Sequence, residues 1–145
     1  MIQIQSSQLG ELSVGEEHII RFSKGILGFE EVTEYILFDI DDSFSYLQSV
    51  ANSELAFIVT DPFIKFPNYE FKLSQEAIEE LRISGDKGLA VRCIVTWNSD
   101  PSRTTINLLA PLVFNIEDQT ARQIVLQDST YQTRHSLPST ESEGS

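Results

Sequence analysis

The sequence contains few cationic side chains. Only 10 of its 145 residues are Lys or Arg, against 22 Asp or Glu, and the formal net charge is −12. Nucleic-acid binding depends on Lys and Arg that displace counterions from phosphates, so this charge argues against direct binding of RNA or DNA. An anionic membrane surface is disfavoured for the same reason. A basic protein partner is favoured, because opposite charges speed encounter and reject wrong partners.

Cysteine and histidine are too sparse for a disulfide or an evident metal site. The one cysteine, Cys93, cannot form an intrachain disulfide, so an oxidising compartment gains no support. The two histidines, His18 and His135, lie far apart in the chain and have no cysteine pair beside them. We therefore expect neither a zinc site nor another metal or cofactor.

Long apolar runs are also missing. No stretch approaches the ~20 apolar residues of a membrane-spanning helix. The first residues, Met-Ile-Gln-Ile-Gln-Ser-Ser, have neither the basic nor the apolar region of a signal peptide. These absences predict a cytoplasmic protein without membrane contact.

What the chain has in abundance is residues that favour strands. Ile, Val, Thr and the aromatic residues total 46, whereas Ala, the strongest helix former, occurs 6 times. Short apolar runs between turn residues indicate about nine or ten strands. One short helix is expected from Ser74 to about Arg82, ended by Gly85. The sequence thus predicts a mostly β protein, a small antiparallel β-barrel with one short helix.

The chain is expected to form a single domain over residues 1–135, followed by a disordered Ser-rich tail over residues 136–145. Within the domain, Leu89–Trp97 alternates between apolar and other residues. This predicts a strand whose buried face carries both Cys93 and Trp97. A thiol in that position is inert rather than nucleophilic.

Motifs of catalysis or metal binding are absent or incomplete. The sequence has no Gly-x-Ser-x-Gly elbow and no P-loop. Asp39, Asp41 and Ser43 have the spacing of a calcium loop, but Phe44 and Val50 stand where glycine and glutamate are required. An acidic hairpin turn is the better interpretation, and we do not expect an enzyme.

Aromatic residues gather around two prolines between residues 57 and 71. Several of them lie on turn segments beside carboxylates, which is typical of protein-binding hot spots. The alternative is that they close one end of the barrel core. The strand over residues 46–50 could add polar groups if it lies at an edge. The candidate partner-binding residues are Tyr46, Gln48, Asp61, Phe63, Phe66, Tyr69 and Glu70.

Taken in order, six motifs resemble the flagellar assembly factor FliW family. Together they span about residues 2–137, and their order and spacing are specific although each alone is weak. In the first motif a proline is expected in place of Ser23 or Leu27. The motifs are Phe22-Ser-Lys-Gly-Ile-Leu-Gly-Phe-Glu30, Tyr46-Leu-Gln-Ser-Val50, Leu55-Ala-Phe-Ile-Val-Thr-Asp-Pro-Phe63, Tyr69-Glu-Phe71, Thr105-Ile-Asn-Leu-Leu-Ala-Pro-Leu-Val-Phe-Asn115 and Ser129-Thr-Tyr-Gln-Thr-Arg-His135.

The resemblance implies a non-enzymatic protein antagonist with a small β-barrel fold. Proteins of this family bind CsrA, a small dimeric RNA-binding repressor of translation, and they bind flagellin in the cytoplasm. When flagellin is exported, the freed factor sequesters CsrA and translation of flagellin mRNA is relieved. CsrA and flagellin are therefore the expected partners of this chain, which we expect to be a monomer.

The distribution of charge fits that expectation. Residues 1–61 carry a net charge of −9 of the total −12, and this acidic half, with Asp61 and Glu70, would meet the basic surface of CsrA. Three alternatives stay open. They are a generic β-barrel chaperone or adaptor for flagellin with no role in RNA regulation, an enzyme with a pocket at the barrel mouth, and direct RNA binding.

Overall fold

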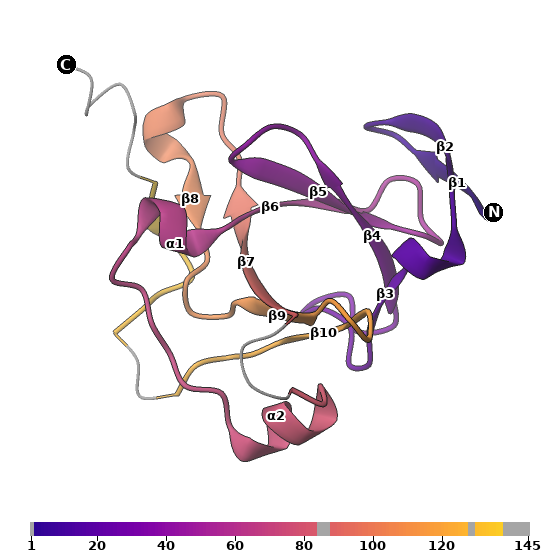
Figure 1. Ribbon diagram of the computed structural model, residues 1–145. Coiled ribbons are helices and arrows are strands. Elements are labelled where there is room, and N and C mark those ends of the chain that lie inside the picture. Colours follow the sequence, from indigo (N-terminus) through magenta and orange to yellow (C-terminus); the bar gives the residue numbers. More distant parts are fainter. Residues whose placement is uncertain (1, 84–87, 128–129, 138–145) are drawn as a thin grey trace.

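The computed structural model describes residues 2–83, 88–127 and 130–137 (Figure 1). These residues form a mostly β fold with two short α-helices. The strands are β1 (Ile2–Ser6), β2 (Gly10–Val14), β3 (Ile20–Phe22), β4 (Glu34–Asp39), β5 (Phe44–Ser49), β6 (Ala56–Thr60), β7 (Leu89–Thr96), β8 (Thr105–Ile106), β9 (Leu112–Asn115), β10 (Thr120–Gln123) and β11 (His135–Ser136). The helices are α1 (Pro62–Lys65) and α2 (Gln75–Glu80), with 3-10 turns η1 (Glu16–His18) and η2 (Pro101–Arg103).

Seven strands close a barrel in the order β7-β6-β5-β4-β3-β10-β9, and β9 pairs back to β7. The β3–β10 pair is parallel, with Arg21 opposite Thr120 and Phe22 opposite Ala121. The other pairs in the ring are antiparallel. The prediction of a small, mostly β barrel is confirmed. The parallel pair was not predicted, because these two strands are distant in the sequence and no hairpin turn connects them.

The inside of the barrel is filled by one face of each strand. Phe22 is fully buried, and its ring meets Tyr35 and Phe114 edge-on, with centroids 5.3 and 5.7 Å apart. Leu47 and Val59 point into the same cluster and are also fully buried. Burial of side chains of this size stabilises the fold by about 1.5–3 kcal/mol each.

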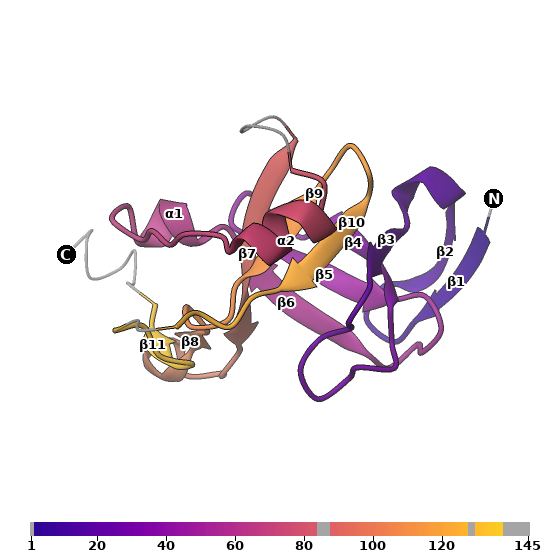
Figure 2. The same cartoon turned by 90° about the horizontal axis from the view of Figure 1, so that it is seen from below.

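The outside of the barrel is covered in three places. In the first, Ile4 of the β1–β2 hairpin packs with Ile36 of β4. In the second, residues 66–71 and 131–137 pack over Cys93 and Val95 of β7. The two views show the hairpin and α1 at opposite ends of the molecule (Figures 1 and 2).

In the third, Leu81 at the end of α2 packs on Val91 of β7 and Val113 of β9. On the outer face of β4, β5 and β6, away from these three covers, some side chains are only half-buried.

Helix α2 begins and ends as local sequence chemistry requires. The Ser74 hydroxyl accepts a hydrogen bond from the Ala77 N–H at 3.1 Å, which is an N-cap. At the other end Arg82 takes a left-handed conformation with φ of 56°, and the Ile83 N–H donates to the Ile78 carbonyl. The predicted helix is confirmed. Its predicted terminator, Gly85, lies outside the described residues.

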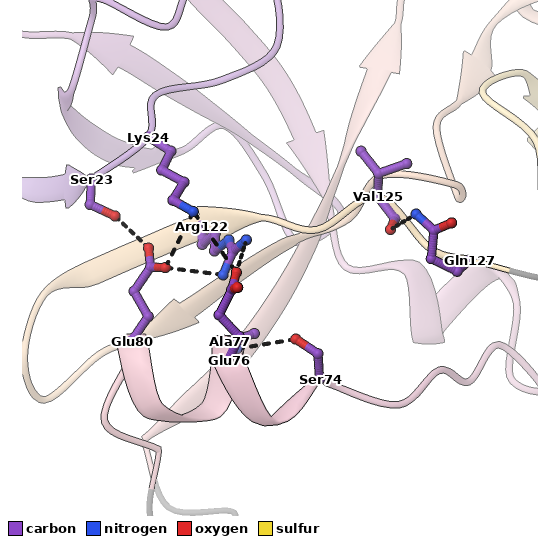
Figure 3. Close-up of polar contacts among 9 residues, drawn as sticks. All are labelled: Ser23, Lys24, Ser74, Glu76, Ala77, Glu80, Arg122, Val125 and Gln127. Carbon is purple, nitrogen blue, oxygen red and sulfur yellow. Dashed lines mark hydrogen bonds and ion pairs between the residues drawn. The ribbon is translucent and has the colours of Figure 1, made fainter.

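An ion-pair network fastens α2 to the barrel (Figure 3). Arg122 of β10 contacts Glu76 at 2.9 Å and Glu80 at 3.0 Å. Lys24 lies 3.8 Å from Glu80, and the Ser23 hydroxyl donates to the same carboxylate at 2.6 Å. The first family-like motif therefore contributes a loop that is tied to α2, which is a structural role.

The ordered chain continues beyond the predicted domain boundary at residue 135. Ser136 of β11 pairs with Thr105 of β8. Leu137 packs against the cluster that contains Tyr69, Cys93 and Val95. The remainder of the predicted tail, residues 138–145, lies outside the described residues. Among the helices described, none is both long and apolar enough to cross a membrane.

Candidate protein-binding surface

Helix α1 follows directly from Asp61-Pro62. The Asp61 carboxylate accepts a hydrogen bond from the Phe63 N–H at 2.9 Å, and Pro62 occupies the first turn, where its missing N–H costs nothing. The Phe66 N–H closes the turn by donating to the Pro62 carbonyl at 2.9 Å. The sequence predicted turn segments here and no helix. A helix of one turn has no periodic pattern from which it could be recognised.

Helix α1 presents apolar side chains to solvent. Phe63 is 41% exposed and Ile64 is 57% exposed. Asp61 lies 3.9 Å from Arg92, while Glu70, at the end of the same segment, is exposed. We call this group the α1 patch; its residues are Asp61, Phe63, Ile64, Phe66 and Glu70. Ile64 was missed by the sequence analysis because its exposure depends on the turn that only the structure reveals.

Tyr69 belongs to the fold rather than to the surface. Its side chain is only 4% exposed, and its hydroxyl donates a hydrogen bond to the Leu108 carbonyl at 2.7 Å. Its ring packs edge-on against Tyr131, with centroids 4.7 Å apart. Burial, with Cys93 beside it, raises the pKa of Tyr69 well above its usual value. The prediction that Tyr69 contacts a partner is therefore corrected: a side chain under this cover is not available to one.

Gln48 is likewise buried, at 0% exposure. Its side-chain oxygen accepts a hydrogen bond from the Ser6 hydroxyl at 2.7 Å. Its amide nitrogen donates to the carbonyls of Asn52 and Leu55, at 3.1 and 3.2 Å. The residue joins the end of β1 to the turn after β5, because buried polar groups require partners of this kind. Its predicted contact with a partner is corrected in the same way.

Tyr46 lies on the outer face of the barrel, away from the three covers. Strand pairing places Phe38, Tyr46 and Ile58 side by side across β4, β5 and β6. All three are half-buried. On the same face the half-buried Phe44 meets Trp97 edge-on, with ring centroids 5.8 Å apart. We call this strip the open face; its residues are Phe38, Ile40, Phe44, Tyr46, Ile58 and Trp97.

Trp97 is the most exposed member of the open face, at 58%. The alternation in β7 was predicted to bury it together with Cys93 and Val95, and this prediction was wrong for Trp97. All three side chains point outward from the barrel, but the cover formed by residues 66–71 and 131–137 reaches only Cys93 and Val95. Alternation therefore identifies the face of a strand correctly but cannot say how far a cover extends along it.

The open face and the α1 patch lie against one buried cluster. Phe44 and Ile58 of the open face and Phe66 of the α1 patch all pack on Tyr69, Cys93 and their neighbours. Carboxylates flank both surfaces: Asp61 is next to α1, Asp39 ends β4, and Asp41 and Asp42 lie in the turn that follows it. Half-exposed aromatic residues beside acidic groups suit a partner with apolar anchors and a basic rim.

The acidic turn at residues 39–43 has a structural explanation. One Asp41 carboxylate oxygen accepts hydrogen bonds from the N–H groups of Ser43 and Phe44, both at 2.8 Å. This side-chain-to-backbone pattern defines the hairpin turn that the sequence predicted. Within the described part of the chain, no group of three or more His, Cys, Asp or Glu could hold a metal ion.

Cys93 is not equipped for nucleophilic chemistry. Its side chain is fully buried, and burial raises the pKa of the thiol to about 12. A nucleophilic cysteine requires a thiolate that substrate can reach. The fold thus defines a class of protein, a small mixed β-barrel.

Comparison with known proteins identifies the family. The family model described as "FliW protein" matches residues 3–137. The flagellar assembly factor FliW of Bacillus subtilis (strain 168) is 40% identical over 136 residues, covering 92% of this chain and 95% of the relative. FliW of Bacillus pumilus (strain SAFR-032) is 38% identical over 136 residues, covering 92% and 94%. The chain belongs to the FliW family, a family of non-enzymatic flagellar assembly factors.

A solved structure agrees with this assignment. The crystal structure of the flagellar assembly factor FliW superimposes with a TM-score of 0.90 at 34% sequence identity. The match covers 94% of this chain and 98% of that one. The likeness therefore extends over the whole barrel together with its covers.

Proposed function

We propose that this protein acts in flagellar assembly by binding two partners in the cytoplasm, the translational repressor CsrA and flagellin. Its binding to CsrA relieves repression of flagellin mRNA without any contact between this protein and RNA. Membership of the FliW family supports the flagellar role. The observation that carries the binding proposal is the pair of half-exposed aromatic surfaces, the α1 patch and the open face, on a chain with a net charge of −12.

The chemistry of these surfaces suits a basic RNA-binding protein. In typical interfaces a few aromatic side chains supply most of the binding energy. Phe63 and Trp97 would have this role here. The nearby carboxylates of Asp61 and Glu70 steer a cationic partner and fix its register. Once bound, the acidic barrel repels RNA from CsrA electrostatically, even where it does not cover the whole RNA site. In this proposal the binding residues are Tyr46, Asp61, Phe63, Ile64, Phe66, Glu70 and Trp97.

Neutralising and reversing charge in the α1 patch tests the electrostatic part. In a variant carrying Asp61→Asn and Glu70→Lys, the asparagine still caps α1, so the helix is retained. We expect CsrA affinity to fall roughly tenfold by calorimetry, and the wild-type affinity to fall with added salt. A matched control, Glu31→Gln with Glu54→Lys, changes the net charge equally at exposed positions outside the patch. Equal CsrA affinity in wild type and the patch variant would contradict the proposed surface.

The alternative function is a flagellin chaperone or adaptor with no role in RNA regulation. A gel shift of a CsrA–RNA complex separates the two, because only a CsrA antagonist releases the RNA when the barrel is added. A pull-down from lysate with the full chain then shows whether CsrA, flagellin or both are captured. Capture of flagellin with an unchanged gel shift would favour the alternative.

A further inference from the structure

A cleft of about 810 Å³ opens on the side of the barrel remote from α1. It lies between the end of β2 and η1 on one side and the turn between β9 and β10 on the other. None of its lining residues belongs to the α1 patch, and of the open face it contains only Phe38. The volume falls within the range of about 300–1,000 Å³ that is usual for ligand sites.

The floor of the cleft is apolar. It is lined by residues of four strands and the β9–β10 turn; Ile20, Ile36 and Phe114 are buried beneath it, whereas Ile116 at its lip is 50% exposed. An exposed isoleucine beside a recess lined by other apolar groups leaves hydrophobic area that an incoming side chain could cover. The floor residues are Val14, Ile20, Ile36, Leu37, Phe38, Phe114 and Ile116.

The rim of the cleft is acidic on both sides. Glu17 of η1 lines one side with a side chain that is 74% exposed, and Glu117 lines the other. Glu16 and Asp118, their chain neighbours, are also exposed. Of the described residues that line the cleft, His18 alone can carry a positive charge, and it lies 3.7 Å from Glu17.

We propose that this cleft is a second docking site, which takes a segment of a partner protein with large apolar side chains flanked by Lys or Arg. The apolar side chains lie on the floor and exclude water, while the flanking cations pair with Glu17 and Glu117. Charge complementarity selects this occupant, because an acidic or uncharged polar segment would gain nothing at the rim. The proposal does not depend on CsrA or flagellin binding at the α1 patch.

A synthetic peptide of about seven residues in which Lys alternates with Leu is the probe, since alternation presents one apolar and one charged face. We expect it to shift the backbone amide resonances of Val14, Glu17 and Ile116 in isotope-labelled protein. A peptide in which Ser replaces Leu should bind at least about tenfold more weakly, because it buries no apolar area. A peptide in which Glu replaces Lys should not bind.

Charge reversal at the rim provides the decisive comparison. The variant Glu17→Lys with Glu117→Lys should weaken the Lys–Leu peptide roughly tenfold. The matched variant Glu31→Lys with Glu54→Lys changes the net charge equally at exposed positions outside the cleft and should bind nearly as wild type. Ile116→Ser tests the floor independently and should also weaken binding. Equal binding by both double variants, equal binding of the Ser peptide, or shifts confined to the α1 patch would each overturn the proposal.

Discussion

The covered region beside β7 and the open face both contain aromatic residues, but these residues differ in their exposure to solvent. Within the cover formed by residues 66–71 and 131–137, Tyr69 is 4% exposed and its hydroxyl is hydrogen-bonded. On the open face, Trp97 is 58% exposed, although the alternation of β7 assigns it to the side of the buried Cys93. The comparison teaches that the exposure of an aromatic residue here is set by the segments that pack around it, and not by the residue type.

Truncation of one aromatic residue from each part is the strongest test of this comparison. Tyr69→Ala removes a buried ring and should lower the free energy of unfolding by about 3–5 kcal/mol. Trp97→Ala removes a mostly exposed ring and should lower it by less than about 1 kcal/mol. Urea denaturation followed by circular dichroism measures both. Within the proposed function, Trp97→Ala should instead weaken CsrA binding by tenfold or more.

One outcome of that experiment would contradict the division. Losses of similar size for Tyr69→Ala and Trp97→Ala would mean that cover does not separate the two residues. A Tyr69→Phe variant serves as the control, because it keeps the ring and removes only the hydroxyl, which hydrogen-bonds to the Leu108 carbonyl and to the Cys93 side chain. It should cost about 1 kcal/mol.

The β1–β2 hairpin is joined to β5 by the buried side chain of Gln48 as well as by apolar packing, and Gln48→Leu tests whether that polar contact stabilises the cover. The leucine approximates the volume but leaves the Ser6 hydroxyl and the carbonyls of Asn52 and Leu55 without this partner. We expect a loss of about 2 kcal/mol in the free energy of unfolding. Ser6→Ala should cost less, and the two changes should not be additive, because they share one network. Additive losses would show that the network does not act as a unit.

Leu81, at the end of helix α2, packs on Val91 and Val113, and charged side chains add ion pairs on the outside of the helix, where the expected effect is the smallest. The hydrogen bond from Arg122 holds the pKa of Glu76 below its usual value of 4.5 in the folded state. The ionised form is thus favoured by folding, so its stabilising contribution is present above the unfolded pKa and is lost as the pH falls through the lower folded pKa. In Arg122→Gln, the loss of stability on acidification should be shallower, as measured by urea midpoints at stepped pH. If stability fell with pH in Arg122→Gln as it does in the wild type, the ion pairs of Arg122 would not be the source of the acid sensitivity.

The sequence predicted those parts of the fold that depend on local chemistry. The Ser74 cap predicted α2, and the alternation in β7 identified its outward face. It also singled out the segment that carries Asp61 and Phe63; in the structure Phe63 is exposed and Asp61 is half-buried. Local signals suffice in these places because caps and alternation act within a few residues.

The wrong predictions concern residues whose burial or exposure depends on segments that are distant in the sequence. Tyr69 is buried in a cluster that joins residues 66–71 to β7 and to residues 131–137, whereas Trp97 lies outside that cluster and is 58% exposed. The cleft above Phe38 and Phe114 is formed by elements from both ends of the chain. No spacing within one segment carries that information, so these placements could not be derived from the sequence pattern alone.

The parallel pairing of β3 with β10 also determines when the barrel can form during synthesis. Arg21 and Thr120 are about 100 residues apart, so the ring stays open until nearly the whole domain has left the ribosome. Up to that point β3 presents an unpaired strand edge, which other chains can join. Long-range closure of this kind slows folding relative to hairpin formation. A newly made chain is therefore most vulnerable to aggregation just before β10 emerges, and any helper that binds early has to protect β3.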